Sequence, residues 1–140
     1  MFSPPAIIVH GLDDARAALR PGLAATLLSA PGAALYAGCL WWRAVVAAAA
    51  AEYPATPVVD LLDCADAPGQ AMAALRAGCR ALVLDPACPA YPRVHAAAAA
   101  MGAVVLPAAP EALDLADPGN LRRVEAWLAA PQRDRSEPVG

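Results

Sequence analysis

Short apolar runs alternate along the chain with alanine-rich stretches in which large apolar residues recur at helical spacing. The runs are continuously apolar rather than alternating in polarity, a pattern typical of strands buried on both faces of a parallel sheet. We predict strands over residues 6–10, 25–29, 58–64, 81–84 and 104–106. Glycine, proline and aspartate punctuate the stretches between them, and helices are predicted over residues 11–20, 33–53, 69–77, 91–101 and about 120–130.

Strands that alternate with helices predict a single α/β domain, because parallel strands must be joined by crossovers and each crossover helix packs on the sheet. We expect a three-layer αβα domain of the flavodoxin-like or Rossmann-like class, with a five-stranded, mainly parallel sheet. The strand order 2-1-3-4-5 is favoured because it is the commonest arrangement of five such strands. The domain is expected to span residues 1–130, and the polar residues 131–140 are expected to form a disordered tail.

The predicted helix over residues 33–53 is apolar on nearly every side, and Arg43 is the one charged residue between positions 33 and 51. A central arginine disfavours a membrane span, so we expect a helix of a soluble protein that is covered on more than one side. Trp41 and Trp42 project about 100° apart on a helix and cannot both face one narrow core stripe. We therefore predict a homo-oligomer, most simply a two-fold dimer, with an interface formed by Tyr36, Trp41, Trp42 and Arg43. The alternative is that the two tryptophans fill a gap under the C-terminal helix.

Composition narrows the classes of function. Of the 140 residues, 59% are hydrophobic and 16% are charged, and the formal net charge is -3. These values exclude a disordered chain and a basic nucleic-acid-binding module. All ten basic residues are arginine, which excludes lysine Schiff-base chemistry and a Walker-type phosphate loop. The first ten residues do not resemble a secretory signal, so a cytoplasmic location is expected.

The four cysteines are Cys39, Cys64, Cys79 and Cys88, and none of their spacings is C-x-x-C or C-x-x-H. Neither a zinc knuckle nor a thioredoxin-type redox pair is therefore indicated, and we expect no metal and no cofactor. Reduced, mostly buried thiols are the simplest expectation.

Potentially reactive side chains gather where the predicted strands end. In open parallel sheets, ligands bind beyond the carboxyl ends of the strands, where the strand order reverses. The side chains at or just after these ends are His10, Ser29, Asp63, Cys64, Asp66, Asp85 and Cys88.

One hypothesis is a site for a small anion. Residues 29–33 join a strand to a helix, so free backbone N–H groups and the helix dipole would attract a phosphate or a carboxylate there. The predicted ligand-binding residues are Ser29, Gly32, Asp63 and Asp66. The alternative is an ordinary loop in which Ser29 or the turn itself caps the helix, since the chain has no glycine-rich phosphate fingerprint.

A second hypothesis is a small hydrolase or lyase. Asp63 and Asp85 lie at adjacent strand ends if the third and fourth strands are neighbours, where they could work as an acid–base pair or share a divalent cation. His10 would act as a general base, and Cys64 or Cys88 as a nucleophile. Each candidate also has a structural interpretation: His10 as a satisfied histidine, Asp66 as a helix cap, Asp85 as a turn residue, and the two cysteines as small buried apolar residues.

An acidic pair at residues 13–14 follows the first predicted strand, Asp63 ends the third, and residues 104–107 precede the last helix. This layout resembles a response-regulator receiver domain over residues 6–128, and the resemblance implies that Asp63 corresponds to the phosphorylated aspartate. The chain departs from receivers in two ways. Residues 10–12 separate the acidic pair from the strand, and Leu106 and Pro107 stand where receivers have a lysine. The resemblance therefore implies a degenerate receiver-like domain that lacks phosphotransfer.

Together these patterns favour a non-catalytic module that binds a small anionic ligand or self-associates. The small hydrolase or lyase and the degenerate receiver are the alternative hypotheses. No nucleic-acid partner and no membrane partner is expected.

Overall fold

The computed structural model of this chain describes residues 3–130. Its strands are β1 (Ala6–Val9), β2 (Ala25–Ser29), β3 (Val58–Asp63), β4 (Ala81–Val83), β5 (Val104–Leu106) and β6 (Ala112–Asp114). Its helices are α1 (Leu12–Leu19), α2 (Ala33–Tyr36), α3 (Cys39–Glu52), α4 (Pro68–Arg76), α5 (Tyr91–Ala100) and α6 (Val124–Ala129), with a 3-10 helix, η1 (Pro118–Arg123), before α6.

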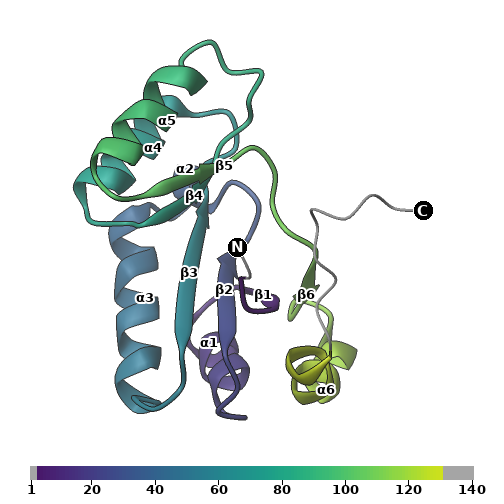
Figure 1. Cartoon of the computed structure of the whole chain (residues 1–140). Coiled ribbons are helices and arrows are strands. Elements are labelled where there is room, and N and C mark those ends of the chain that lie inside the picture. The colour runs from purple at the N-terminus through teal and green to yellow at the C-terminus, as the bar shows by residue number, and fades with distance from the viewer. Residues whose placement is uncertain (1–2, 131–140) are drawn as a thin grey trace.

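The strands form one all-parallel sheet in the order β5-β4-β3-β2-β1-β6 (Figure 1). The predicted α/β domain of the Rossmann-like or flavodoxin-like class is confirmed. The strand order 2-1-3-4-5 is wrong, because β2, β3, β4 and β5 are each added on the same side of the preceding strand. The order also departs from the 2-1-3-4-5 arrangement of receiver-type folds. The alternation of strands and helices does not fix the direction in which each crossover steps, so it left this choice open.

Because each of these crossovers steps in the same direction, a right-handed connection places its helix on the same face of the sheet every time. Buried side chains from all six α-helices accordingly belong to one core cluster, which they share with strand residues such as Ile7, Leu27 and Leu62. The smaller cluster on the opposite face is centred on Leu28 and Leu61, and it contains strand residues but no helical ones. Within residues 3–130, the helix layer predicted for the second face is therefore not found.

A sixth strand was not predicted. After β5 the chain bends at residues 107–108 and runs through residues 109–111 to the far edge of the sheet, where β6 pairs with β1 (Figure 1). β6 is only three residues long and follows a segment rich in proline and alanine, so it has no recognisable apolar run. Past β6, α6 is tied back to β1 by a hydrogen bond from Trp127 Nε1 to the carbonyl oxygen of Ala6, with the two atoms 2.8 Å apart.

The single helix predicted over residues 33–53 is two helices, α2 and α3. Gly38 separates them with a φ of 85°, a left-handed conformation that side chains with a Cβ rarely adopt. The predicted C-terminal helix likewise begins as the 3-10 helix η1 and becomes α-helical at Val124. The predicted tail at 131–140 lies outside the described residues. No helix in the described part of the chain has the length and hydrophobicity needed to cross a membrane.

Candidate functional site

All six strands are parallel, so their carboxyl ends lie along one edge of the sheet, and the strand order decides which side chains meet there. His10 follows β1, whereas Asp85 follows β4, and β2 and β3 lie between these strands. Three strand spacings separate the two positions by about 14 Å. The residues proposed for catalysis are therefore divided between two separate places on the edge.

The first place is an open pocket between the loop after β3 and the loop after β4. Its volume is about 440 Å³, and its lining residues are Asp66, Pro68, Asp85, Ala87, Cys88, Pro89 and Ala90. Asp66 and Asp85 are exposed and Cys88 is half-buried, so two carboxylates and one thiol border the pocket. No basic side chain is among the lining residues.

Asp63 shapes the rim of this pocket rather than lining it. Its Oδ1 accepts a hydrogen bond from the backbone N–H of Ala65 at 2.8 Å, and its own N–H donates to Ser29 Oγ at 2.9 Å. Ala65 has a φ of 49°, an uncommon left-handed conformation for alanine, and its carbonyl accepts the N–H of Asp85 at 2.8 Å. The two loops are thus held together through their backbones.

The sequence suggested that Asp85 is a turn residue and that Asp66 is a helix cap, and the contacts of the two side chains differ in the structure. Asp85 Oδ1 accepts the backbone N–H of Ala87 at 2.9 Å, which is the bond expected of a turn residue. The N-terminal cap of α4 is Ala67, and no side chain caps that helix. Asp66 therefore does not cap α4, and its carboxylate is exposed at the pocket.

The buried cysteines are poor nucleophiles. Burial, and to a lesser extent the nearby carboxylate of Asp63, raises the pKa of the Cys64 thiol to about 12. Burial, and to a lesser extent the negative charge of Asp60, raises the pKa of the Cys79 thiol to about 11. Both thiols are therefore protonated at neutral pH, and Cys64, which was a candidate nucleophile, is completely buried.

Asp60 was not singled out from the sequence, although it is the one charged residue before the end of an otherwise apolar strand. Its position in β3 aligns with the core residue Leu27, so its side chain lies on the helix-covered face. Burial raises the pKa of Asp60, and the charge of Arg43 and the indole of Trp42 only partly offset this effect. Arg43 also donates from Nη1 to the carbonyl of Gly78 at 2.9 Å.

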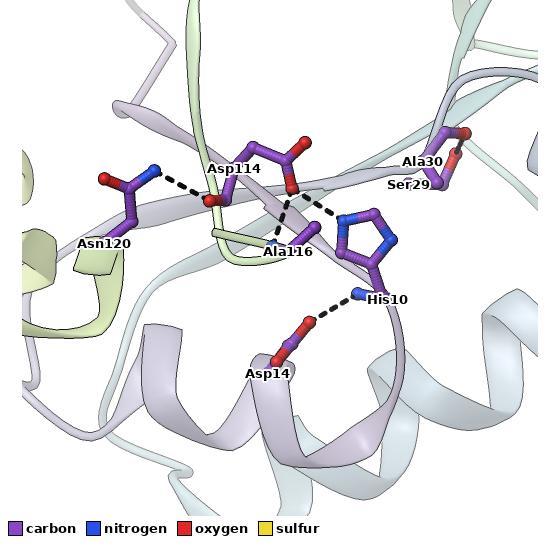
Figure 2. Close-up of polar contacts among 7 residues, drawn as sticks. All are labelled: His10, Asp14, Ser29, Ala30, Asp114, Ala116 and Asn120. Atoms are coloured by element: carbon purple, nitrogen blue, oxygen red, sulfur yellow. Dashed lines mark hydrogen bonds and ion pairs between the residues drawn. The ribbon is translucent and has the colours of Figure 1, made fainter. Parts of the chain in front are cut away.

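The second place on the edge is a histidine–aspartate pair, which Figure 2 shows at the ends of β1 and β6. His10 Nε2 and Asp114 Oδ1 are 2.6 Å apart. The backbone N–H of Ala116 donates to the same carboxylate oxygen at 2.9 Å, the side-chain amide of Asn120 donates to the Asp114 carbonyl, and the His10 N–H donates to Asp14. Desolvation acts to raise the pKa of Asp114, but these bonds to its carboxylate and the charge of His10 bring it below its ordinary value.

This pair occupies the position where the strand order reverses, because β1 is followed by β2 on one side and flanked by β6 on the other. The side chains are 36% and 44% exposed, so solvent reaches both. When Nε2 donates to Asp114, Nδ1 is left as a proton acceptor, which is the arrangement of an oriented general base. Asp114 was missed from the sequence because β6 was missed.

Ser29 does not complete a catalytic triad. It is 1% exposed, its hydroxyl donates to the Ala30 carbonyl at 3.1 Å, and its oxygen accepts the N–H of Asp63. Figure 2 shows this hydroxyl beside Ala30 rather than beside His10. Within residues 3–130, no hydrogen bond joins Ser29 to the histidine.

The loop proposed for anion binding has little to attract an anion. Gly32 adopts a φ of 70° at the start of α2, a helix of four residues with a correspondingly small dipole. The N–H of Ala33 is already bonded to the Ala30 carbonyl at 3.0 Å. Ser29 neither caps the helix nor reaches solvent.

The predicted interface residues separate into exposed and buried ones. Tyr36 and Trp41 are 70% and 36% exposed, while Trp42 is completely buried in the core. Trp42 therefore cannot line a surface, and Trp41 is the tryptophan that faces outward. The interpretation that both fill a gap under the C-terminal helix is wrong, because α3 packs against β3 whereas Trp127 of α6 bonds to β1.

Among the described residues, no group of three or more histidine, cysteine, aspartate or glutamate side chains is arranged to hold a metal ion. No protein-family model and no curated protein matches this chain.

Proposed function

We propose that this protein binds a small molecule carrying an ammonium or guanidinium group in the pocket between the loop after β3 and the loop after β4. The observation that carries the proposal is the lining, in which Asp66 and Asp85 supply two carboxylates and no basic side chain opposes them. The volume of about 440 Å³ falls within the usual range for small-ligand sites, about 300 to 1,000 Å³. Proline and alanine side chains supply apolar surface for the rest of such a ligand.

The carboxylates favour a cationic ligand over the small anion expected from the sequence, because two negative charges at the rim repel a phosphate or a carboxylate. Binding is favoured over the predicted hydrolase or lyase because His10, its proposed general base, lies three strand spacings from Asp85 and does not line the pocket. Asp85 remains accessible while its Oδ1 holds the turn, so it presents a fixed carboxylate to a ligand.

We further propose a cytoplasmic location. All four cysteines are free, and free thiols persist where the compartment is reducing.

A thermal-shift titration tests the pocket. The probes are 1,4-diaminobutane and arginine methyl ester as cations, with inorganic phosphate and acetate as anions, at constant ionic strength. A cation at 100 times its dissociation constant is expected to stabilise the fold by about 2.7 kcal/mol, and the anions are expected to have no effect.

Three variants locate the binding. Asp85→Asn retains an oxygen that can accept the Ala87 N–H, so the turn is kept while the charge is lost, and Asp66→Asn changes an exposed side chain. Each is expected to weaken cation binding at least fivefold. Asp13→Asn, at a side chain 97% exposed on α1, is the matched control and should bind like the wild type. A larger shift with phosphate than with the amines, or equal loss in the control, contradicts the proposal.

A further inference from the structure

The outer face of α3 is apolar along its whole length. Leu40, Ala44, Ala47, Ala48 and Ala51 are all exposed and follow the spacing i, i+4, i+7, i+8 and i+11, which defines one stripe on a helix. We refer to these five residues as the α3 stripe. In Figure 1, α3 lies at the margin of the molecule, with β3 on one side and no described element on its far side. A stripe of this kind normally packs against another helix.

The two ends of the stripe differ in size. Leu40 is 73% exposed at the N-terminal end, and Leu35, Tyr36 and Trp41, which lie within five residues of it in the sequence, are also large and exposed. The C-terminal end, from Ala47 to Ala51, exposes only alanine methyl groups. A surface that is bulky at one end and small at the other is complementary to a copy of itself turned end over end.

We propose that a second copy of this chain packs on the α3 stripe, with the two α3 helices antiparallel across a two-fold axis. In the register that overlaps the stripes completely, Leu40 of each chain lies over Ala51 of the other, and Ala44 lies over Ala47. Each bulky end then meets a small end, and the alanines between them allow the helix axes to approach to about 8 Å. The contact is isologous, as a closed dimer requires.

The charges on α3 are compatible with this pairing. Its two charged side chains, Arg43 and Glu52, flank the stripe rather than interrupt it. Arg43 bonds to the Gly78 carbonyl, and both Glu52 oxygens accept hydrogen bonds from Arg16 at 2.8 Å. Closing the stripe therefore buries no unpaired charge, which matches the depletion of charge at interface cores.

The area suits a weak dimer. At their observed exposures, Leu40 and Trp41 present roughly 200 Å² of surface on α3. With the exposed alanines, each chain contributes roughly 450 Å², or roughly 900 Å² in total, which is the size of weak, transient interfaces.

Light scattering after size exclusion, between about 1 and 200 µM, measures the assembly. The wild type is expected to reach 28.4 kDa, twice the 14.2 kDa chain mass, as concentration rises. Leu40→Glu is expected to stay monomeric, and circular dichroism should show it folded because the side chain is already mostly exposed. Ala99→Glu, an exposed helical alanine on α5, is the matched control and should still dimerise.

A charge rescue tests the orientation. Ala51→Lys alone should weaken the dimer, whereas Leu40→Glu combined with Ala51→Lys should restore it, because each glutamate then faces the partner's introduced lysine. The two positions are about 16 Å apart within one chain, too far for pairing in cis. A wild type that remains monomeric at 200 µM overturns the dimer, and binding of that monomer to phosphatidylcholine vesicles would assign the stripe to lipid instead. A dimer that the double variant does not restore overturns the antiparallel register.

Discussion

The two adjacent tryptophans provide a direct test of the α3 packing, because one lies in the core and the other at the surface. Trp42 is the largest fully buried side chain, and its Nε1 has no hydrogen-bond partner among the described residues. The indole of Trp42 acts to lower the pKa of the nearby Asp60 carboxylate, but Nε1 does not form a hydrogen bond with that carboxylate. We predict that Trp42→Ala is strongly destabilising and that Trp42→Phe is nearly neutral.

The magnitudes follow from area and desolvation. A tryptophan side chain buries up to about 250 Å², worth about 6 kcal/mol at 25 cal/mol per Å². Burying the unpaired indole N–H costs about 1 to 3 kcal/mol, which offsets part of the gain from burial, and truncation to alanine removes that cost as well. Trp42→Ala should therefore lower the unfolding free energy by about 3 to 5 kcal/mol, as large-to-small core substitutions do. Trp42→Phe keeps most of the ring and loses the unpaired donor, so we expect a change within about 1 kcal/mol.

Urea unfolding followed by far-ultraviolet circular dichroism at about 1 µM chain measures these changes, with an unchanged slope as evidence of an unaltered transition. Trp41→Ala is the control, since Trp41 is 36% exposed and water can fill the vacated space. It should cost less than Trp42→Ala. The reasoning is refuted if Trp41→Ala costs more, or if Trp42→Phe costs as much as Trp42→Ala, which would mean that the indole N–H has a partner in solution.

Two further predictions follow from the titratable groups. Because the pKa values of Cys64 and Cys79 are about 12 and 11, both thiols should resist iodoacetamide at pH 8 while Cys88 reacts. In urea, mass spectrometry should find all three cysteines modified. Equal rates of modification for Cys64 and Cys88 in the folded protein would contradict this prediction. Because the pKa of Asp60 is raised in the folded state, the folded protein takes up this proton at a higher pH than the unfolded chain does. The ionised carboxylate therefore lowers the unfolding free energy at neutral pH, and this destabilisation disappears on acidification. Asp60→Asn should therefore be more stable than the wild type at pH 7, with a difference that narrows towards pH 4; a difference that widens on acidification would rule out the assignment.

The local structure could be predicted where apolar runs are strong. The ranges of β2 and β5 are as predicted, and β1, β3 and β4 each end one residue before their predicted ends. The break at Gly38 was missed because glycine inside an apolar helical pattern is often tolerated, and only the backbone angle reveals the left-handed turn. β6 was missed because three residues carry no periodicity.

The sequence by itself determined the α/β class and the gathering of reactive side chains at the carboxyl ends of the strands, because both depend on periodicity and on the parallel arrangement that it favours. Only the tertiary structure decided the strand order, and with it which of these side chains meet. The neighbouring of the Asp66 and Asp85 loops is common to the predicted and the observed order, but the observed order inserts β2 between β1 and β3 and so moves His10 further from them. The return of β6 to the β1 edge places Asp114 beside His10. The physical reason is that a crossover can step to either side of its strand at similar local cost, so the choice lies in the packing of the whole sheet and its helices.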